Sequence, residues 1–242
     1  MELLFYKKIT AIDKDKHRDL RIGAIKDFRF TAETNSVPLA AVEFFEAAKE
    51  YPIVFAGRGS PSPVPAALLG LRSNENLMLG AGGKWDARYI PAFIRRYPFV
   101  LASADQEQFV ICVDEGHPAV GSKDGEALFS AQGEPTPYLN NAIAFLRDFQ
   151  GETQRTREFM KRLAELDLLH EVAARAEVKN GGAYQLSGFS VVNETKYRAL
   201  DKDVVDELFR KGWLALIDAH LLSLGNLGRL VDRLSQAKPK AR

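Results

Sequence analysis

A single apolar stripe near the C-terminus constrains the fold of this chain more than any other feature. Its residues recur at alternating four- and three-residue steps: Trp213, Ile217, His220, Leu224, Leu227, Val231 and Leu234. This spacing places them on one face of an α-helix, and further leucines widen that face. A coiled-coil pair requires a narrower and cleaner seam. We therefore expect the helix to pack along its whole length against the rest of the same chain.

A second helical pattern covers residues 139–166, with apolar positions at Leu139, Ile143, Leu146, Phe149, Met160, Leu163 and Leu166. Between Phe149 and Phe159 the stripe contains no large apolar residue, and Gly151 lies in this gap. The pattern fits either one long helix with a polar waist or two helices that meet at a bend. Thr153 and Thr156 occupy the waist. In a buried waist their hydroxyls would bond the carbonyl one turn back and help to line a small-molecule site, but we favour a solvent-exposed helix midpoint.

Residues 1–133 are predicted to be β-rich, because short apolar runs separated by Gly, Pro, Asn or Ser are typical of strands and turns. We expect strands in the runs ELLFYKKITAI, DFRFTA, PIVFAG, AALLGL, NLMLG, FVLAS and QFVICVDE. The run GRGSPSPVP, between the third and fourth of these, is expected to be an exposed loop. Two helices interrupt the strands. Pro38 begins the first and Pro52 ends it, while Asp86 caps the second and Pro98 ends it.

Beyond residue 134 the pattern is mainly helical. A short hairpin is expected to turn at residues 180–182, and a helix to run from Asp203 to Phe209 before a Lys-Gly stop signal. The basic tail, residues 236–242, is expected to be disordered. The predicted fold class is therefore α+β. A β-rich part with short interrupting helices, residues 1–133, precedes a mainly helical part, residues 134–242, that packs on it as one compact unit.

Charge and cysteine content exclude several classes of protein. The chain holds 33 Lys and Arg residues and 32 Asp and Glu residues, a formal charge of +1, so no net field attracts nucleic acid or an anionic membrane. The single cysteine, Cys112, excludes an intramolecular disulfide and a multi-cysteine metal site. The N-terminus lacks the pattern of a secretory signal, and no run reaches the roughly 18 uninterrupted apolar residues of a membrane span. We expect a soluble, cytoplasmic protein without membrane insertion and without a nucleic-acid partner.

The segment KWDARYIPAFIRRYPFVLA places two adjacent arginines among aromatic and aliphatic residues. On a helix Arg95 and Arg96 diverge by about 100°, whereas aromatic residues at four-residue spacing from Tyr89 share one face. A guanidinium there either packs on a ring or meets a carboxylate, which we favour, or it clamps an anionic ligand. Trp85, beside GAGGK, is either a plug for the end of a sheet, which we favour, or a ligand-stacking aromatic.

Catalytic signatures are absent from the sequence. Asp114 and Glu115 end a strand, where carboxylates can serve catalysis, but strand neighbours point to opposite faces, and we favour an ordinary solvated strand end. The histidines lack metal-binding spacing. His220 lies on the apolar stripe of the last helix and Cys112 lies in an apolar run, so both are expected in the core. No nucleophile elbow, Walker or dinucleotide motif occurs. We predict no catalytic residue, metal or cofactor. The candidate ligand-binding residues are Trp85, Tyr89, Arg95, Arg96, Asp114 and Glu115.

Six blocks of the sequence resemble the SapC family of bacterial proteins. In chain order they are NSVPLAAVEFFEAAKEYPIVFAG, LLGLRSNENLML, WDARYIPAFIRRYPFVL, GEPTPYLNNAIAFLRDFQ, RTREFMKRLAELDLL and LSGFSVVNETKYRAL. The family is named after a protein linked to the paracrystalline surface layer. The resemblance implies such a link, or an accessory role in uptake or modification of a peptide-like compound, and carries no established reaction. A peptide-transport permease also called SapC needs several membrane spans and is excluded.

Three functions are compatible with these expectations. The leading one is a soluble, non-enzymatic SapC-like binding or accessory protein with a groove for a peptide-like or small polar ligand. The first alternative is an enzyme acting on a peptide or amino-acid derivative, in which Arg95 or Arg96 binds a carboxylate and Asp114 or Glu115 handles protons. The second alternative is a homo-oligomeric interaction module assembled through the helix of residues 213–234. A protein partner is also compatible with the sequence.

Overall fold

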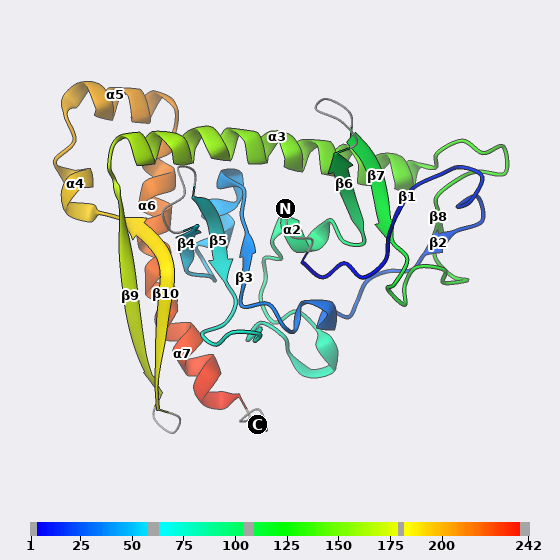
Figure 1. Cartoon of the computed structure of the whole chain (residues 1–242), viewed down its shortest axis with the longest axis horizontal. Coiled ribbons are helices and arrows are strands. Elements are labelled where there is room, and N and C mark those ends of the chain that lie inside the picture. The colour runs from blue at the N-terminus through cyan, green and yellow to red at the C-terminus, as the bar shows by residue number, and fades with distance from the viewer. Residues whose placement is uncertain (1–3, 58–62, 104–108, 179–181, 238–242) are drawn as a thin grey trace.

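Antiparallel β-sheets form the framework of the protein. The computed structural model describes residues 4–57, 63–103, 109–178 and 182–237. Its largest sheet has the order β3 (Ser36–Pro38), β5 (Val64–Leu68), β4 (Ile53–Ala56), β10 (Gly182–Val192) and β9 (Leu169–Val178). The second has the order β1 (Ile9–Ala11), β7 (Phe109–Asp114) and β6 (Phe99–Ser103), and a further pair joins β2 (Arg21–Ile22) to β8 (Glu126–Ala127). With its helices the chain is α+β, which confirms the predicted fold class (Figure 1).

One long helix, α3 (Pro137–Glu165), runs above both larger sheets (Figure 1). Its N-terminus is capped by Thr136, whose Oγ1 accepts a hydrogen bond from the backbone N–H of Leu139 at 3.4 Å, and a proline follows in the first turn. The helix continues through Gly151 without a bend. The second helical pattern of the sequence therefore corresponds to one helix and not to two.

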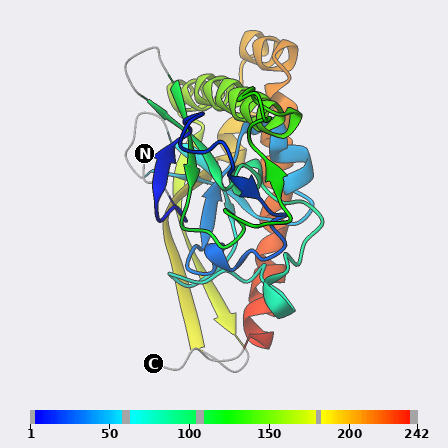
Figure 2. The same cartoon turned by 90° about the vertical axis from the view of Figure 1, so that its right-hand side faces the viewer.

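The C-terminal stripe forms a continuous helical column made of α6 (Trp213–Ser223), η4 (Leu224–Asn226) and α7 (Leu227–Gln236). Figure 2 shows this column standing along one side of the molecule. Ile217, Leu230 and Leu234 are buried in a hydrophobic core to which strands of the five-stranded sheet also contribute. Intramolecular packing of the stripe is thus confirmed. By length and composition alone, this column is the one described helical stretch that could cross a membrane.

The region between α3 and the C-terminal column contains the predicted hairpin and two short helices. The strands β9 and β10 are longer than the short hairpin expected, and their turn, residues 179–181, lies outside the described residues. Next come α4 (Glu194–Arg198) and α5 (Lys202–Arg210). The predicted stop is confirmed by Gly212, whose φ of 70° is left-handed and suits a residue without Cβ. Of the predicted disordered tail, residues 238–242 also lie outside the described part.

Several short elements of the first half differ from the sequence expectation. The run DFRFTA contains the 3-10 turn η1 (Arg29–Thr31), because the Thr31 hydroxyl and N–H both bond the Phe28 carbonyl, at 2.8 and 2.9 Å. The run NLMLG contributes only an isolated bridge between Leu79 and Trp85. Another 3-10 turn, η3 (Ala81–Gly83), lies between these two residues.

The two predicted helices of the first half are shorter than expected. Pro38 ends strand β3 and does not begin a helix, and the helical residues after it are η2 (Ala41–Glu43) and α1 (Phe44–Ala47). Asp86 does not cap α2 (Ala92–Arg95). That role passes to the backbone of Pro91, whose carbonyl accepts from the N–H groups of the first helical turn at 2.9 and 3.1 Å. Residues 58–62 of the expected loop are not described, and the last two residues of that loop, Val64 and Pro65, belong to β5.

Two hydrophobic cores meet below α3. The larger core lies around the five-stranded sheet and includes Phe159 and Met160 of α3, and the smaller lies around β6 and β7 and includes Leu139 and Leu146. The large sheet also joins the two halves of the sequence, because β10 pairs with β4. The division of the chain at residue 134 stays a prediction.

Both residues predicted to be core fillers are buried. The neutral ring of His220 accepts a hydrogen bond at Nε2 from the Val192 N–H at 3.1 Å and lies 4.5 Å from the ring of Phe55. Burial lowers the pKa of His220 to about 4. Cys112 is buried in β7, and burial raises the pKa of its thiol.

Candidate functional site

A groove of about 580 Å³ lies below the middle of α3, where the two cores meet. Its walls come from α3, from β6 and β7, and from the residue that follows α2. The described residues that line it are Arg96, Leu101, Phe109, Leu146, Arg147, Phe149, Gln150, Gly151, Thr153, Gln154 and Arg157. The groove lies along residues 146–157 of α3, between the part of the helix in the smaller core and the part in the larger core.

The floor of this groove contains Arg96, a buried arginine with 6% of its surface exposed. Its guanidinium carbon lies 4.0 Å from the ring centre of Phe93 and 5.4 Å from that of Phe149. Among the described residues, neither Nε nor Nη2 of Arg96 finds a hydrogen-bond partner, and both atoms are shielded from solvent. A buried donor without a partner is unfavourable, so the site holds unsatisfied hydrogen-bonding capacity.

The unpartnered atoms form one edge of the guanidinium, and other arginines of this chain use that same edge to bind a carboxylate. Arg162 donates from Nε and Nη2 to Glu207 at 3.2 and 2.7 Å. Arg72 binds Glu75 in the same two-pronged way. This fork matches the two oxygens of a carboxylate. In Arg96 the same fork is present, and no carboxylate of the described residues meets it.

Burial also acts on the charge of Arg96. It lowers the pKa of the guanidinium, and the Tyr6 hydroxyl opposes this effect only in part. Burial raises the pKa of Tyr6 to about 12, so that tyrosine is neutral at physiological pH and donates to the Phe99 carbonyl at 2.8 Å. A neutral phenol supplies no counter-charge. The guanidinium, which stays protonated in proteins, is therefore left without an anionic neighbour in the described structure.

Positive charge dominates the lining of the groove. Arg147 and Arg157 lie on α3 together with two glutamines, and no Asp or Glu is among the described residues that line the groove. Arg157 donates to Gln154 at 3.4 Å. Like charges gathered around a concave, partly apolar surface raise the local concentration of anions. The lining thus favours a ligand with an anionic group.

The polar waist of α3 borders this groove through Thr153, and Thr156 of the same waist is buried, so the expectation of a solvent-exposed midpoint is wrong. Thr156 is buried, donates to the Glu152 carbonyl at 2.6 Å and accepts from the Ala41 N–H at 2.7 Å. Thr153 donates to the carbonyl one turn back at 2.8 Å. At Gly151, an added Cβ would meet nothing within 4 Å. The waist is polar because it joins α3 to the turn η2 and borders a cavity.

Arg95 and Tyr89 lie near Arg96 in sequence but serve different contacts. Arg95 is exposed, donates from Nε to the Ile90 carbonyl at 2.9 Å and lies 5.8 Å from the Tyr89 ring centre. The Tyr89 hydroxyl donates to Glu43 at 2.6 Å. Burial, together with Glu43, raises the pKa of Tyr89. Glu43, which the sequence did not single out, is buried and accepts two backbone N–H groups as well, so it ties η2 to α2.

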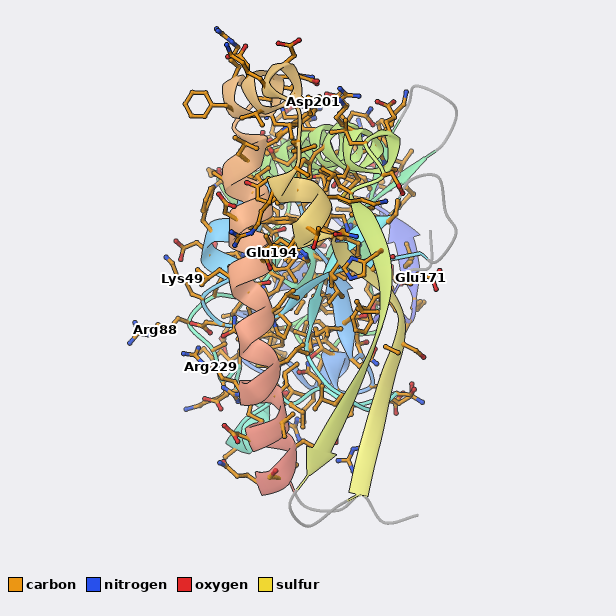
Figure 3. All side chains as sticks on the ribbon, turned by 90° about the vertical axis from the view of Figure 1, so that its left-hand side faces the viewer. Lys49, Arg88, Glu171, Glu194, Asp201 and Arg229 are labelled. Carbon is orange, nitrogen blue, oxygen red and sulfur yellow. The ribbon has the colours of Figure 1, made fainter. Side chains whose placement is uncertain are left out.

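Trp85 lines a separate pocket, also of about 580 Å³, on the edge of the molecule where Lys49, Arg88 and Arg229 lie beside α6 and α7 (Figure 3). Its indole N–H donates to the Tyr51 hydroxyl at 2.9 Å and its ring packs against the large core. These contacts are those of a plug.

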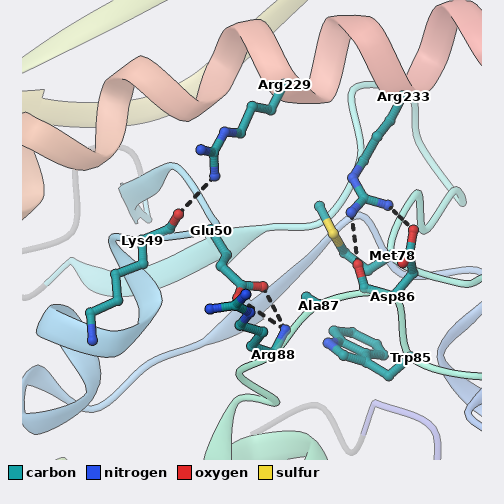
Figure 4. A pocket seen from close by; sticks show the side chains of 9 residues that line it. All are labelled: Lys49, Glu50, Met78, Trp85, Asp86, Ala87, Arg88, Arg229 and Arg233. Atoms are coloured by element: carbon teal, nitrogen blue, oxygen red, sulfur yellow. Dashed lines mark hydrogen bonds and ion pairs between the residues drawn. The ribbon is translucent and has the colours of Figure 1, made fainter.

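Several polar groups of the Trp85 pocket already have hydrogen-bond partners (Figure 4). Arg233 donates to the Asp86 carboxylate at 2.7 Å, and Arg229 donates to a backbone carbonyl at 2.9 Å. Glu50 accepts the Arg88 N–H with both oxygens, at 2.9 and 2.8 Å. The contacts of Arg229 and Arg233 join α7 to the residues that follow α1 and to the loop that contains Asp86. The groove at Arg96 is therefore the better candidate for an anion.

Asp114 is fully buried and does not line the groove at Arg96. Its carboxylate accepts from the N–H groups of Lys7, Lys8 and Gly116 at 2.8 to 2.9 Å and from the Tyr97 hydroxyl at 2.9 Å. Burial alone would raise its pKa, but these donors more than compensate, so the pKa lies below its ordinary value. Asp114 is an anchor for the N-terminal segment, and the expectation of a solvated strand end is wrong for it.

Glu115 is partly buried beside two lysines and a histidine. It pairs with Lys16 at 2.7 Å and Lys8 at 2.8 Å, and His17 Nε2 lies 3.1 Å away. These three groups hold the pKa of Glu115 well below its usual range. The six predicted site residues thus do not converge on one cavity. In the described part of the chain, no group of three or more His, Cys, Asp or Glu side chains could hold a metal ion.

Comparison with known proteins places the chain in a family. The sequence model of the SapC family matches residues 12–230. No curated protein matches the chain, and no solved structure does. The matched range includes α3, the groove at Arg96 and every described strand except β1. This chain is therefore a member of the SapC family.

Proposed function

We propose that this SapC-family protein binds a peptide-like or small ligand through a carboxylate that Arg96 receives in the groove below α3. The observation that carries the proposal is the unpartnered Nε–Nη2 edge of a buried arginine that lines a cavity. A ligand carboxylate would satisfy both donors and supply the missing negative charge. Arg147 and Arg157 would attract the anion to the groove.

Binding requires a local adjustment of Arg96. Its Nε and Nη2 atoms are shielded in the ligand-free structure, so the guanidinium must turn toward the groove to meet the ligand. The rings of Phe93 and Phe149 provide flat surfaces for this turn, since a guanidinium stacks on an aromatic face without a fixed direction for its edge.

The enzyme alternative receives less support. It assigned proton transfer to Asp114 or Glu115, but backbone donors hold the first and surface cations hold the second. A general base must reach the proton it removes, and neither carboxylate is among the described residues that line the groove. A binding or accessory role is therefore the better proposal. The link to the bacterial surface layer and a cytoplasmic location stay predictions.

Isothermal titration with matched ligands tests the proposal. N-acetyl amino acids and short peptides are compared with the same compounds carrying a C-terminal amide in place of the carboxylate. We expect the carboxylate forms to bind and the amide forms to bind at least about tenfold more weakly, because the amide leaves the fork unmatched. Phenyl phosphate is the third arm, and tighter binding of this compound would replace the carboxylate by a phosphate as the anion.

Two neighbouring variants provide the matched comparison. Arg96→Gln removes the fork, and Arg95→Gln removes an exposed guanidinium one residue away. We expect carboxylate binding to be lost in R96Q and retained in R95Q. In a protein labelled with ¹⁵N, the Nε–H signal of Arg96 should shift when the carboxylate binds. Equal binding by R96Q and the unaltered protein would contradict the proposal.

A further inference from the structure

A second, smaller compartment continues the groove toward the large core. It has a volume of about 170 Å³, and it shares Phe149, Thr153 and Arg157 with the groove at Arg96. Its other described lining residues are Pro38, Leu39, Pro63, Val64, Pro65, Phe93, Thr156 and Met160. Two compartments with common walls can take two parts of one molecule.

The lining of this compartment is apolar in effect, even where it includes threonines. The Thr153 hydroxyl donates to the carbonyl one turn back, and the Thr156 hydroxyl both donates to a carbonyl and accepts the Ala41 N–H. Both hydroxyl protons are thus already used in hydrogen bonds within the protein, and each threonine also presents a methyl group. Three prolines restrict the backbone of the facing wall. Apart from Arg157, which it shares with the groove, the compartment is lined mainly by apolar groups and by backbone with little freedom to move.

We infer that the ligand bears an aromatic or branched aliphatic group next to its carboxylate, as the C-terminal residue of an apolar peptide or an N-acylated apolar amino acid does. This inference rests on the proposed function, since Arg96 supplies the carboxylate site. The volume supports a ring-sized occupant, because an apolar protein cavity of about 150 Å³ is large enough to take up benzene. Arg96 itself borders the compartment through Phe93 and Phe149, whose rings it contacts.

The size of the compartment distinguishes this ligand from a fatty acid. A long acyl chain combines a carboxylate with a continuous apolar tail, and about 170 Å³ does not hold such a tail. The charge pattern alone would admit both ligands. Chain length and ring size are therefore the variables that an experiment should change.

The test is a titration series at constant carboxylate. N-acetylalanine, N-acetylleucine, N-acetylphenylalanine and decanoate are titrated into the unaltered protein and into R96Q. We expect N-acetylleucine and N-acetylphenylalanine to bind at least about tenfold more tightly than N-acetylalanine, because each added methylene in a fitted apolar pocket increases affinity by about that factor. Decanoate should bind more weakly than N-acetylphenylalanine.

A variant that fills the compartment provides an independent check. Val64, half-exposed at the start of β5, lines the compartment and does not line the larger groove, so Val64→Phe should reduce the preference for N-acetylphenylalanine over N-acetylalanine to below about threefold. Val205→Phe on α5, a partly exposed valine that lines neither cavity, is the matched control and should retain the preference.

The outcomes separate the two proposals. Equal affinities for N-acetylalanine and N-acetylphenylalanine, both lost in R96Q, would overturn the inference about the apolar group and leave the carboxylate site intact. Tightest binding of decanoate would also overturn it. Absence of binding by every compound, or binding that R96Q does not change, would overturn both proposals.

Discussion

Replacing Arg96 by methionine should make the ligand-free protein more stable. The guanidinium leaves two buried donors, Nε and Nη2, without partners among the described residues, and each costs about 1–3 kcal/mol. The stacked ring of Phe93 at 4.0 Å returns roughly 2 kcal/mol through its cation–π interaction. Methionine keeps an unbranched apolar stem, removes both donors and packs well beside aromatic rings. The balance favours R96M by about 2 kcal/mol, within a range of about 0–4 kcal/mol.

Urea unfolding followed by circular dichroism measures this difference. A gain of this size would also raise the melting temperature of a chain of this length by about 2–4 °C per kcal/mol. Arg95→Met is the control and should change stability by less than about 0.5 kcal/mol, because its guanidinium is exposed. A folded R96M protein that is less stable than the unaltered one by more than about 1 kcal/mol would refute the reasoning, since it would show that Arg96 stabilises the empty groove.

Three further substitutions test other parts of the structure by urea unfolding. Thr156→Val leaves the buried N–H of Ala41 without an acceptor and should cost about 1–3 kcal/mol, whereas Thr153→Val, whose hydroxyl bonds only within α3, should cost less than about 1 kcal/mol; equal losses would contradict this. Gly151→Ala should stabilise the protein by about 0.5–1 kcal/mol, because the new methyl meets no atom within 4 Å, and a loss would show a hidden contact. Burial lowers the pKa of His220 to about 4, below about 6.5 in the unfolded chain, so the unfolded state binds more protons between these values. Stability should be full above about pH 6.5 and fall by up to roughly 3 kcal/mol toward pH 4, and His220→Gln should remove this fall; an unchanged pH profile in the variant would refute the assignment.

The long helices could be predicted from the sequence because their pattern is local. A three- and four-residue repeat over many residues identifies the apolar face of α3 and of the column from α6 to α7 without knowledge of the partner surface. The predictions for the short elements were wrong because the local pattern of these runs does not decide their structure. In DFRFTA and NLMLG the hydrophobic run is compatible with a strand or a turn, and single side-chain contacts, such as that of the Thr31 hydroxyl, decide between them.

The candidate site was predicted only in fragments. Arg96 and the polar waist of α3 were each noticed as exceptions to an apolar pattern, but nothing in the sequence showed that they face the same groove. Their meeting depends on α3 crossing both sheets, which is a long-range property of the fold. Arg147 and Phe149 were missed as site residues because an arginine and a phenylalanine on an amphipathic helix are ordinary. The sequence signal that could have found them was the interruption at Gly151.

The pairing of β4 with β10 has a consequence for how the protein is made. Ala56 meets Phe189, so the inner edge of β4 must await a strand that leaves the ribosome much later. At translation rates of about 5–20 residues per second, this delay lasts many seconds. Exposed strand edges invite pairing with other chains, and such distant contacts form slowly. A nascent chain of this protein therefore exposes one edge of β4 until β10 has been synthesised.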